Sequence, residues 1–113
     1  MKRDVSLFLE DILKASKAIE SFVVGLSLEQ FSADDKTSSA VVKKLEILGE
    51  AAKQIPQKVR STISLPWKEM AGMMDRLTHS YFGIDFRLVW DVVKNKLPEV
   101  KKEIERFLAK GER

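Results

Sequence analysis

The chain has 113 residues, 44% of them apolar, so it can bury one hydrophobic core and is too short for two. Lys and Arg number 20 against 17 Asp and Glu, and a formal charge of +3 does not by itself indicate nucleic-acid binding. The absence of cysteine excludes disulfides, thiol catalysis and cysteine-bound metal, and it fits a reducing compartment such as the cytoplasm. Charges at Glu10, Asp11 and Lys14 interrupt the first apolar stretch. We therefore expect a soluble single domain over residues 1–113, with no signal peptide and no membrane span.

The first element is predicted to be a long amphipathic helix. Apolar residues recur every three or four positions and place this helix over about residues 4–24. Gly25 then supplies a helix stop. Ser27, with Gln30 three residues later, resembles a capping box for a short helical turn, which we expect Phe31 to anchor.

A second long helix is predicted from an apolar stripe over residues 41–55. It ends at Pro56, because proline removes a backbone donor and cannot continue the helix. Gly49 lies inside this stripe. A residue without a side chain costs helix propensity but lets another helix approach closely, so we expect tight helix packing at this level.

The rest of the chain is also predicted to be helical. Residues 57–66 form a connector, a third stripe covers residues 67–83, and a fourth covers residues 86–108. Pro98 either kinks this last helix or begins a new one. No segment alternates with the period of a strand. The predicted fold is all-α, an up-and-down bundle of four to five helices.

One segment, residues 75–85, combines side chains suited to chemistry. It contains the only histidine, His79, and the only tyrosine. On a helix, Asp75, Arg76 and His79 fall away from the apolar stripe that includes Met74, so we expect them outside the core. Imidazole exchanges a proton near pH 7 and guanidinium matches phosphate oxygens, which suits phosphate-ester chemistry. From spacing alone, a solvated surface histidine is the more common explanation.

Longer motifs make the sequence more informative. The segments His79-Ser80-Tyr81-Phe82-Gly83-Ile84-Asp85, Leu45-Glu46-Ile47-Leu48-Gly49-Glu50-Ala51-Ala52 and Val89-Trp90-Asp91-Val92-Val93, followed by Leu97-Pro98, occur in one order. In this combination the chain resembles the HepT-like branch of the HEPN superfamily. The resemblance covers most of the chain and is far more specific than the histidine alone.

The resemblance implies a helical homodimer with a cleft between the two histidine helices, and an endoribonuclease that needs neither metal nor cofactor. His79 would act as general base or acid while the RNA 2′-hydroxyl attacks the adjacent phosphate, and an arginine would stabilise phosphoryl charge. The products would be a 2′,3′-cyclic phosphate and a 5′-hydroxyl. By the same analogy, Glu50 and Asp75 would orient groups near the cleft.

The resemblance also implies a partner. Tyr81 matches the tyrosine that a nucleotidyltransferase antitoxin modifies with AMP in type VII-like toxin–antitoxin pairs. A bulky anion beside the cleft would block it and repel RNA phosphates. Tyr81 also falls on the apolar stripe, where it would be an ordinary packed residue.

Position 74 departs from the family pattern. Five residues before His79, where the family has its motif arginine, this chain has Met74, which can neither carry charge nor donate to phosphate. Arg76 could substitute, the chain could be an inactive relative, or Met74 could be a change made to express a toxic protein. Two functions follow: an attenuated ribonuclease toxin, or an inactive module that docks a nucleotidyltransferase or binds a nucleotide.

Overall fold

The structure, a computed structural model, describes residues 3–78 and 83–111. Within these ranges the regular elements are all helical, which confirms the all-α prediction. In chain order they are α1 (Val5–Val23), α2 (Leu28–Ala33), α3 (Asp35–Lys53), α4 (Gln57–Arg60), α5 (Trp67–Thr78), α6 (Phe86–Asp91), the π-helix η1 (Val92–Lys96) and α7 (Leu97–Ala109). Among the described residues, none of the helices combines the length and apolar content that a membrane crossing needs.

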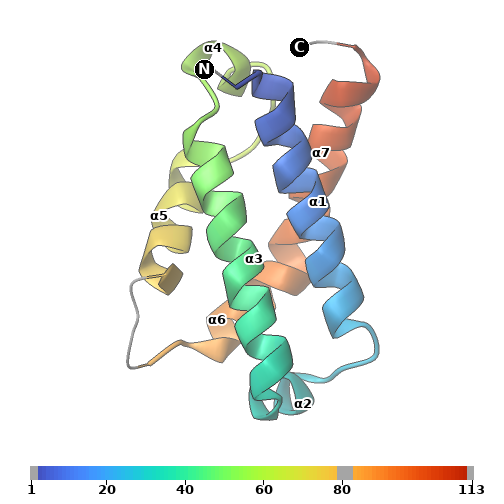
Figure 1. The fold of residues 1–113 in the computed structure, drawn as a ribbon, viewed down its shortest axis with the longest axis vertical. Helices are drawn as coiled ribbons and strands as arrows, with labels where there is room; N and C mark the ends of the chain where they lie inside the picture. The colour runs from blue at the N-terminus through green and yellow to red at the C-terminus, as the bar shows by residue number, and fades with distance from the viewer. Residues whose placement is uncertain (1–2, 79–82, 112–113) are drawn as a thin grey trace.

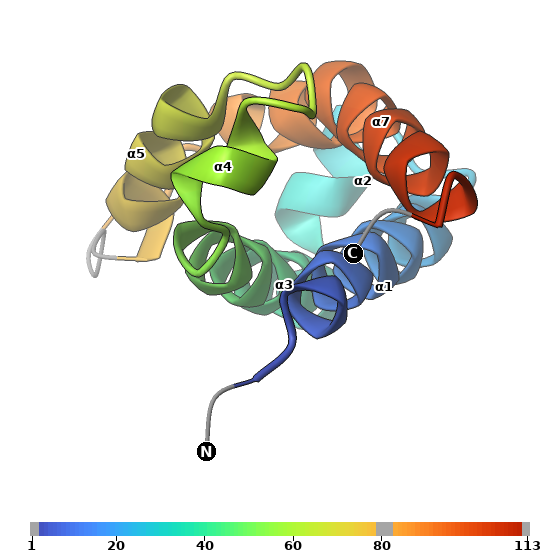
Figure 2. The ribbon, with the colours of Figure 1, turned by 90° about the horizontal axis from the view of Figure 1, so that it is seen from above.

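The long helices form an up-and-down bundle. Figure 1 shows α1 and α3 antiparallel and side by side, with α5 against α3 and α7 against α1. Seen from above, these four helices surround a common interior, and α2 and α6 lie together at one end of it (Figure 2). The bundle measures 41 × 27 × 25 Å. The predicted architecture is therefore confirmed, with short helices added at the ends of the long ones.

Phe31 anchors the end of the bundle where α2 and α6 meet. Its side chain is completely buried, as predicted for the short turn that became α2. The ring lies edge-on to Phe86, with centroids 5.9 Å apart, and 5.2 Å from the ring of Trp90. Phe86 and Trp90 belong to α6, the first helix after the His79 segment. Phe31 thus connects the N-terminal half of the chain to the element that follows the candidate site.

Hydrogen-bonding side chains set where the helices begin. Ser27 Oγ accepts from the Gln30 N–H at 3.1 Å and Gln30 Oε1 accepts from the Ser27 N–H at 2.9 Å, so the predicted capping box is confirmed. Asp34 starts α3 before its apolar stripe, because its carboxylate accepts from the Thr37 backbone and hydroxyl. Hydrogen bonds from Thr37 hold the pKa of Asp34 below its ordinary value. This cap therefore weakens only as pH falls through that lowered pKa.

The sequence left open whether Pro98 kinks the last helix or begins a new one, and the structure shows that it lies at the beginning of a new helix. Pro98 lies in the first turn of α7, where its missing N–H is not needed. Immediately before it, the chain takes a π-helical turn, and the Leu97 N–H donates to the Val92 carbonyl five residues back. The α6, η1 and α7 segments thus follow one another directly, and an inserted π-turn separates α6 from the proline-initiated helix.

Gly49 allows α3 and α5 to approach closely. A Cβ atom built on Gly49 would lie 2.5 Å from Cβ and 2.9 Å from Cγ of Met74 on α5. Real Cβ atoms do not come this near, and the obstructing atoms are at the base of the methionine rather than its flexible end. The predicted close packing at this level is confirmed.

Replacing Gly49 with alanine is expected to lower the free energy of unfolding by up to about 2 kcal/mol. Overpacking costs about 1–3 kcal/mol, and it outweighs the roughly 1 kcal/mol gained from better helix propensity. Gly72 is the matched control, because it lies inside α5, is exposed and has no atom within 4 Å of a built Cβ. Gly72→Ala should therefore stabilise by about 0.5–1 kcal/mol. Urea denaturation of both variants tests the pair, and a stabilised Gly49→Ala protein would contradict the close approach.

Candidate functional site

The predicted site residues cluster at the end of α5 and on the facing surface of α3. Met74, Asp75 and Arg76 lie in the last turns of α5, and Glu50 lies on α3. His79 and Tyr81 lie outside the described residues. The structure therefore places the groups that lead into the histidine segment, while the roles of His79 and Tyr81 remain predictions from sequence.

Met74 points into the bundle. Its side chain is only 3% exposed and packs against Gly49. Of the other apolar residues of α5 that the sequence placed on this stripe, Trp67, Met70 and Leu77 are buried with it and Ala71 is half-buried. The position where the family pattern has an arginine thus lies in the α3–α5 contact of the single chain.

Asp75 and Arg76 lie outside the core, as the helical spacing predicted. Asp75 is half-buried and Arg76 is exposed. The other end of the segment is also defined: Asp85 accepts hydrogen bonds from the N–H groups of Arg87 and Leu88 at 3.0 and 3.2 Å, and so caps α6. The last turn of α5 and a capped helix start thus flank the His79 segment in the sequence.

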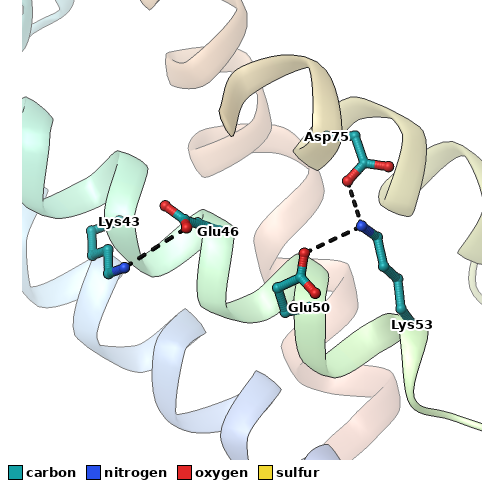
Figure 3. A network of polar contacts seen from close by, with 5 residues as sticks. All are labelled: Lys43, Glu46, Glu50, Lys53 and Asp75. Atoms are coloured by element: carbon teal, nitrogen blue, oxygen red, sulfur yellow. Dashed lines mark hydrogen bonds and ion pairs between the residues drawn. The ribbon is translucent and has the colours of Figure 1, made fainter. Parts of the chain in front are cut away.

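A lysine that the sequence did not single out connects the two predicted carboxylates. Lys53, at the end of α3, donates from Nζ to Asp75 Oδ1 at 2.5 Å and to Glu50 Oε1 at 3.2 Å (Figure 3). The hydrogen bonds that Lys53 donates to Asp75, the larger effect, and to Glu50 raise the pKa of Lys53 above its ordinary value. The ammonium is therefore charged at neutral pH, and its share of this ionic contact is lost as pH rises through the raised pKa.

Only part of this network could be predicted from the sequence. Lys53 follows Glu50 by three residues, which is a pairing distance on one helix. Its contact with Asp75 joins residues 22 positions apart on different helices and depends on the α3–α5 packing. Ion pairs between distant residues also join α7 to α1: Lys101 to Glu20 at 2.7 Å and Glu105 to Lys17 at 3.7 Å.

The tryptophans serve as packing residues, as expected. Trp67 is 7% exposed and donates from Nε1 to the Ile63 carbonyl at 3.1 Å. Trp90 is half-buried and packs on Phe31. A cationic side chain also lies over each ring, Arg60 at 5.8 Å from the Trp67 centroid and Lys94 at 5.0 Å from the Trp90 centroid.

The described residues contain no group of three or more His, Asp or Glu side chains that could hold a metal ion. The carboxylates of Glu50 and Asp75 both accept hydrogen bonds from Lys53, which lies between them (Figure 3). The charged groups of Glu50, Lys53 and Asp75 connect α3 to α5 just before the histidine in the sequence.

Comparison with known proteins identifies the class to which this helical bundle belongs. Residues 12–107 match the family model described as Ribonuclease HepT-like. A Thermococcus cleftensis protein named "Probable ribonuclease HepT" is 45% identical over 108 residues, which cover 95% of this chain and 98% of that protein. A Methanocaldococcus jannaschii protein with a provisional RNase name is 43% identical over 108 residues, covering 95% and 89% of the two chains.

A bacterial relative extends the comparison. A Caldanaerobacter subterraneus protein, also with a provisional RNase name, is 40% identical over 104 residues, covering 91% of this chain and 93% of that protein. No solved structure matches the chain with significance. The family model and the relatives each span nearly the whole chain, and the chain therefore belongs to the HepT-like ribonuclease family.

Proposed function

We propose that this protein is an endoribonuclease toxin that cleaves RNA through His79 without a metal ion. The observation that carries the proposal is family membership over residues 12–107, together with a histidine segment that follows directly on α5. The flanking geometry supports it, because α5 and the Asp85-capped α6 are fixed on either side of the segment. A general acid or base needs such a fixed frame to reach one particular proton.

The proposed reaction is an internal transesterification. His79, as base, takes the proton of the RNA 2′-hydroxyl, and the 2′-oxygen attacks the adjacent phosphorus. The bond from phosphorus to the 5′-oxygen breaks, and a general acid returns a proton to that oxygen. The products are a 2′,3′-cyclic phosphate and a 5′-hydroxyl. In the proposed homodimer, the His79 segments of the two copies face one cleft, so both the general base and the general acid are available there.

Met74 attenuates this activity. Charge develops on the phosphoryl oxygens in the transition state, and a positioned cation there typically contributes about a hundred- to a thousandfold in rate. Met74 contributes none, and its side chain is buried against Gly49. Arg76 is exposed on the turn that leads to His79 and is the cation best placed to compensate in part.

The biological setting we propose is a toxin–antitoxin pair in the cytoplasm. A nucleotidyltransferase antitoxin would transfer AMP from ATP to the Tyr81 hydroxyl and release pyrophosphate, which would place a bulky anion beside the cleft. Mass spectrometry of this chain after incubation with such a partner and ATP is expected to find one added AMP on Tyr81. Modification elsewhere, or no modification, would remove this step from the account.

A second candidate function is favoured by the burial of Met74. Because the position of the motif arginine lies in the α3–α5 contact, the domain could keep the family fold without the catalytic cation. It would then be a binding module that docks the nucleotidyltransferase or holds a nucleotide. This candidate requires binding of the partner without any RNA cleavage by the chain.

The two candidates separate in an assay on RNA that carries a single 2′-deoxy nucleotide. With EDTA present, the ribonuclease is expected to cleave an all-ribose strand and leave 2′,3′-cyclic phosphate ends, while the linkage after the deoxy nucleotide stays intact. Mass spectrometry of the products reads both results. Cleavage at the deoxy linkage would contradict attack by the 2′-oxygen, and no cleavage of any strand would favour the binding module.

A further inference from the structure

Lys53, the last residue of α3, forms an ion pair with Asp75 in the last turns of α5 at the candidate site. We infer that Lys53 is a positioning residue for the RNA-cleaving site: by holding Asp75, it fixes the end of α5 from which the His79 segment departs. The inference rests on the proposed function for its catalytic consequence. The contact that carries it is the hydrogen bond from Lys53 Nζ to Asp75 Oδ1, 2.5 Å long and independent of that function.

The charge balance argues against a direct role for Lys53 in binding phosphate. Its ammonium has three donors, of which one goes to Asp75 and one to Glu50. Two carboxylates around one ammonium leave the group with a net charge of about −1 at neutral pH. An RNA phosphate could accept from the third donor only by approaching these two negative charges. Positioning is therefore the role that the surroundings of Lys53 permit.

The base of Lys53 is firmly held, which a positioning residue requires. Lys53 is the last residue of α3, and the preceding residues Leu48 and Ala52 are almost completely buried. Arg60 donates to the carbonyls of Ala52 at 3.0 Å and Ile55 at 2.8 Å, so its side chain ties together the last turn of α3 and the residues that follow it. The lysine therefore extends from a fixed point in the bundle.

The other end of the contact is close to the chemistry. Asp75 directly follows Met74, which packs against Gly49 where α3 and α5 approach most tightly. Asp75 also precedes His79 by four residues. The contact thus constrains α5 on the side facing α3, between the tight packing point and the segment where the proposed reaction occurs.

Lys43 provides a matched control on the same helix. It pairs with Glu46 at 3.7 Å within α3, and its side chain is 65% exposed, against 35% for Lys53 (Figure 3). Both lysines reach carboxylates through flexible side chains, but only the one at position 53 connects two helices. Removing Lys43 tests the loss of a surface charge alone.

Amide hydrogen exchange tests the structural half of the inference without any RNA. Lys53→Met is expected to speed amide exchange in residues 73–78 of α5 by about fivefold, because a partly shielded ion pair is lost. Lys53→Arg should restore the protection, and Lys43→Met should leave it unchanged. In an Asp75→Asn background, Lys53→Met should add little. Equal protection in the original chain and Lys53→Met, or an equal effect of Lys43→Met, would overturn the positioning role.

RNA cleavage tests the catalytic half. Lys53→Met is expected to lower kcat by about ten- to a hundredfold with KM nearly unchanged, because misplacement of a reacting group costs rate rather than binding. Lys53→Arg should recover most of that rate, and Lys43→Met should retain all of it. A rise in KM alone would overturn the inference and make Lys53 an RNA-binding residue.

Failure of the proposed function gives a different pattern. If the original chain, Lys53→Met and Lys53→Arg all fail to cleave RNA while exchange in α5 changes as expected, the ribonuclease proposal fails and the Lys53–Asp75 constraint stands. If RNA is cleaved and neither exchange nor kcat responds to Lys53→Met, the constraint fails and the ribonuclease proposal stands.

Discussion

Met74→Arg is expected to raise the rate of RNA cleavage by about a hundred- to a thousandfold. The substitution restores a positive charge near the phosphoryl oxygens, where removal of one positioned donor typically costs that much. Met74 is buried where α5 meets Gly49 of α3, so an arginine there would pack its aliphatic stem in this contact and would have to extend its guanidinium past it, as long basic side chains do. Single-turnover cleavage of a labelled RNA measures the gain.

Two controls separate charge from packing in this experiment. Met74→Gln has a polar, uncharged end on a stem of similar length and should give no comparable gain. Met74→Arg combined with His79→Ala should lose the gain, because the cation acts on a reaction that the histidine starts. A folded Met74→Arg protein that is no faster than the original chain would show that position 74 is not where the motif arginine acts.

Phe31→Ala is expected to lower the free energy of unfolding by about 3–5 kcal/mol, the typical cost of removing a buried aromatic ring. Phe31 is completely buried and contacts both Phe86 and Trp90. The loss is a large share of the roughly 5–15 kcal/mol by which domains are usually stable. Because α6 rests on this ring, the variant should also exchange amide hydrogens faster in α6 than in α1.

Phe22→Ala is the control for the cavity at Phe31. Phe22 is 38% exposed at the end of α1, so its truncation should cost about 1 kcal/mol or less. Urea denaturation followed by circular dichroism measures both variants. Similar losses of unfolding free energy at the two positions would contradict the view that Phe31 anchors the end of the bundle where α2 and α6 meet.

Local sequence signals predicted most of the fold because they act over a few residues. The spacing of apolar residues gave the long helices, Ser27 and Gln30 gave a capping box, and the missing side chain of Gly49 gave the close approach of a second helix. Asp34 was the exception. Its cap starts α3 before the apolar stripe begins, so a pattern of hydrophobic residues alone places the start of that helix too late.

Features that depend on packing between distant segments could not be predicted. Lys53 and Asp75 are 22 positions apart, and nothing in either local pattern indicates that they meet. The π-turn before Pro98 likewise reflects how the last helix fits the bundle. Helical spacing did place Asp75 and Arg76 outside the core and Met74 on the buried stripe. The chemistry assigned to His79 comes from the family motif, and it remains a prediction.

The most direct test of this account is single-turnover RNA cleavage, with protein in excess, by the chain as it stands and by His79→Ala. The account predicts slow cleavage by the original protein, reduced about a hundred- to ten-thousandfold in the variant, as loss of a general acid or base requires. Circular dichroism establishes that both proteins are equally helical. Equal cleavage by the two proteins would show that His79 takes no part in the reaction. If neither protein cleaves RNA, the result would contradict a ribonuclease function for this chain.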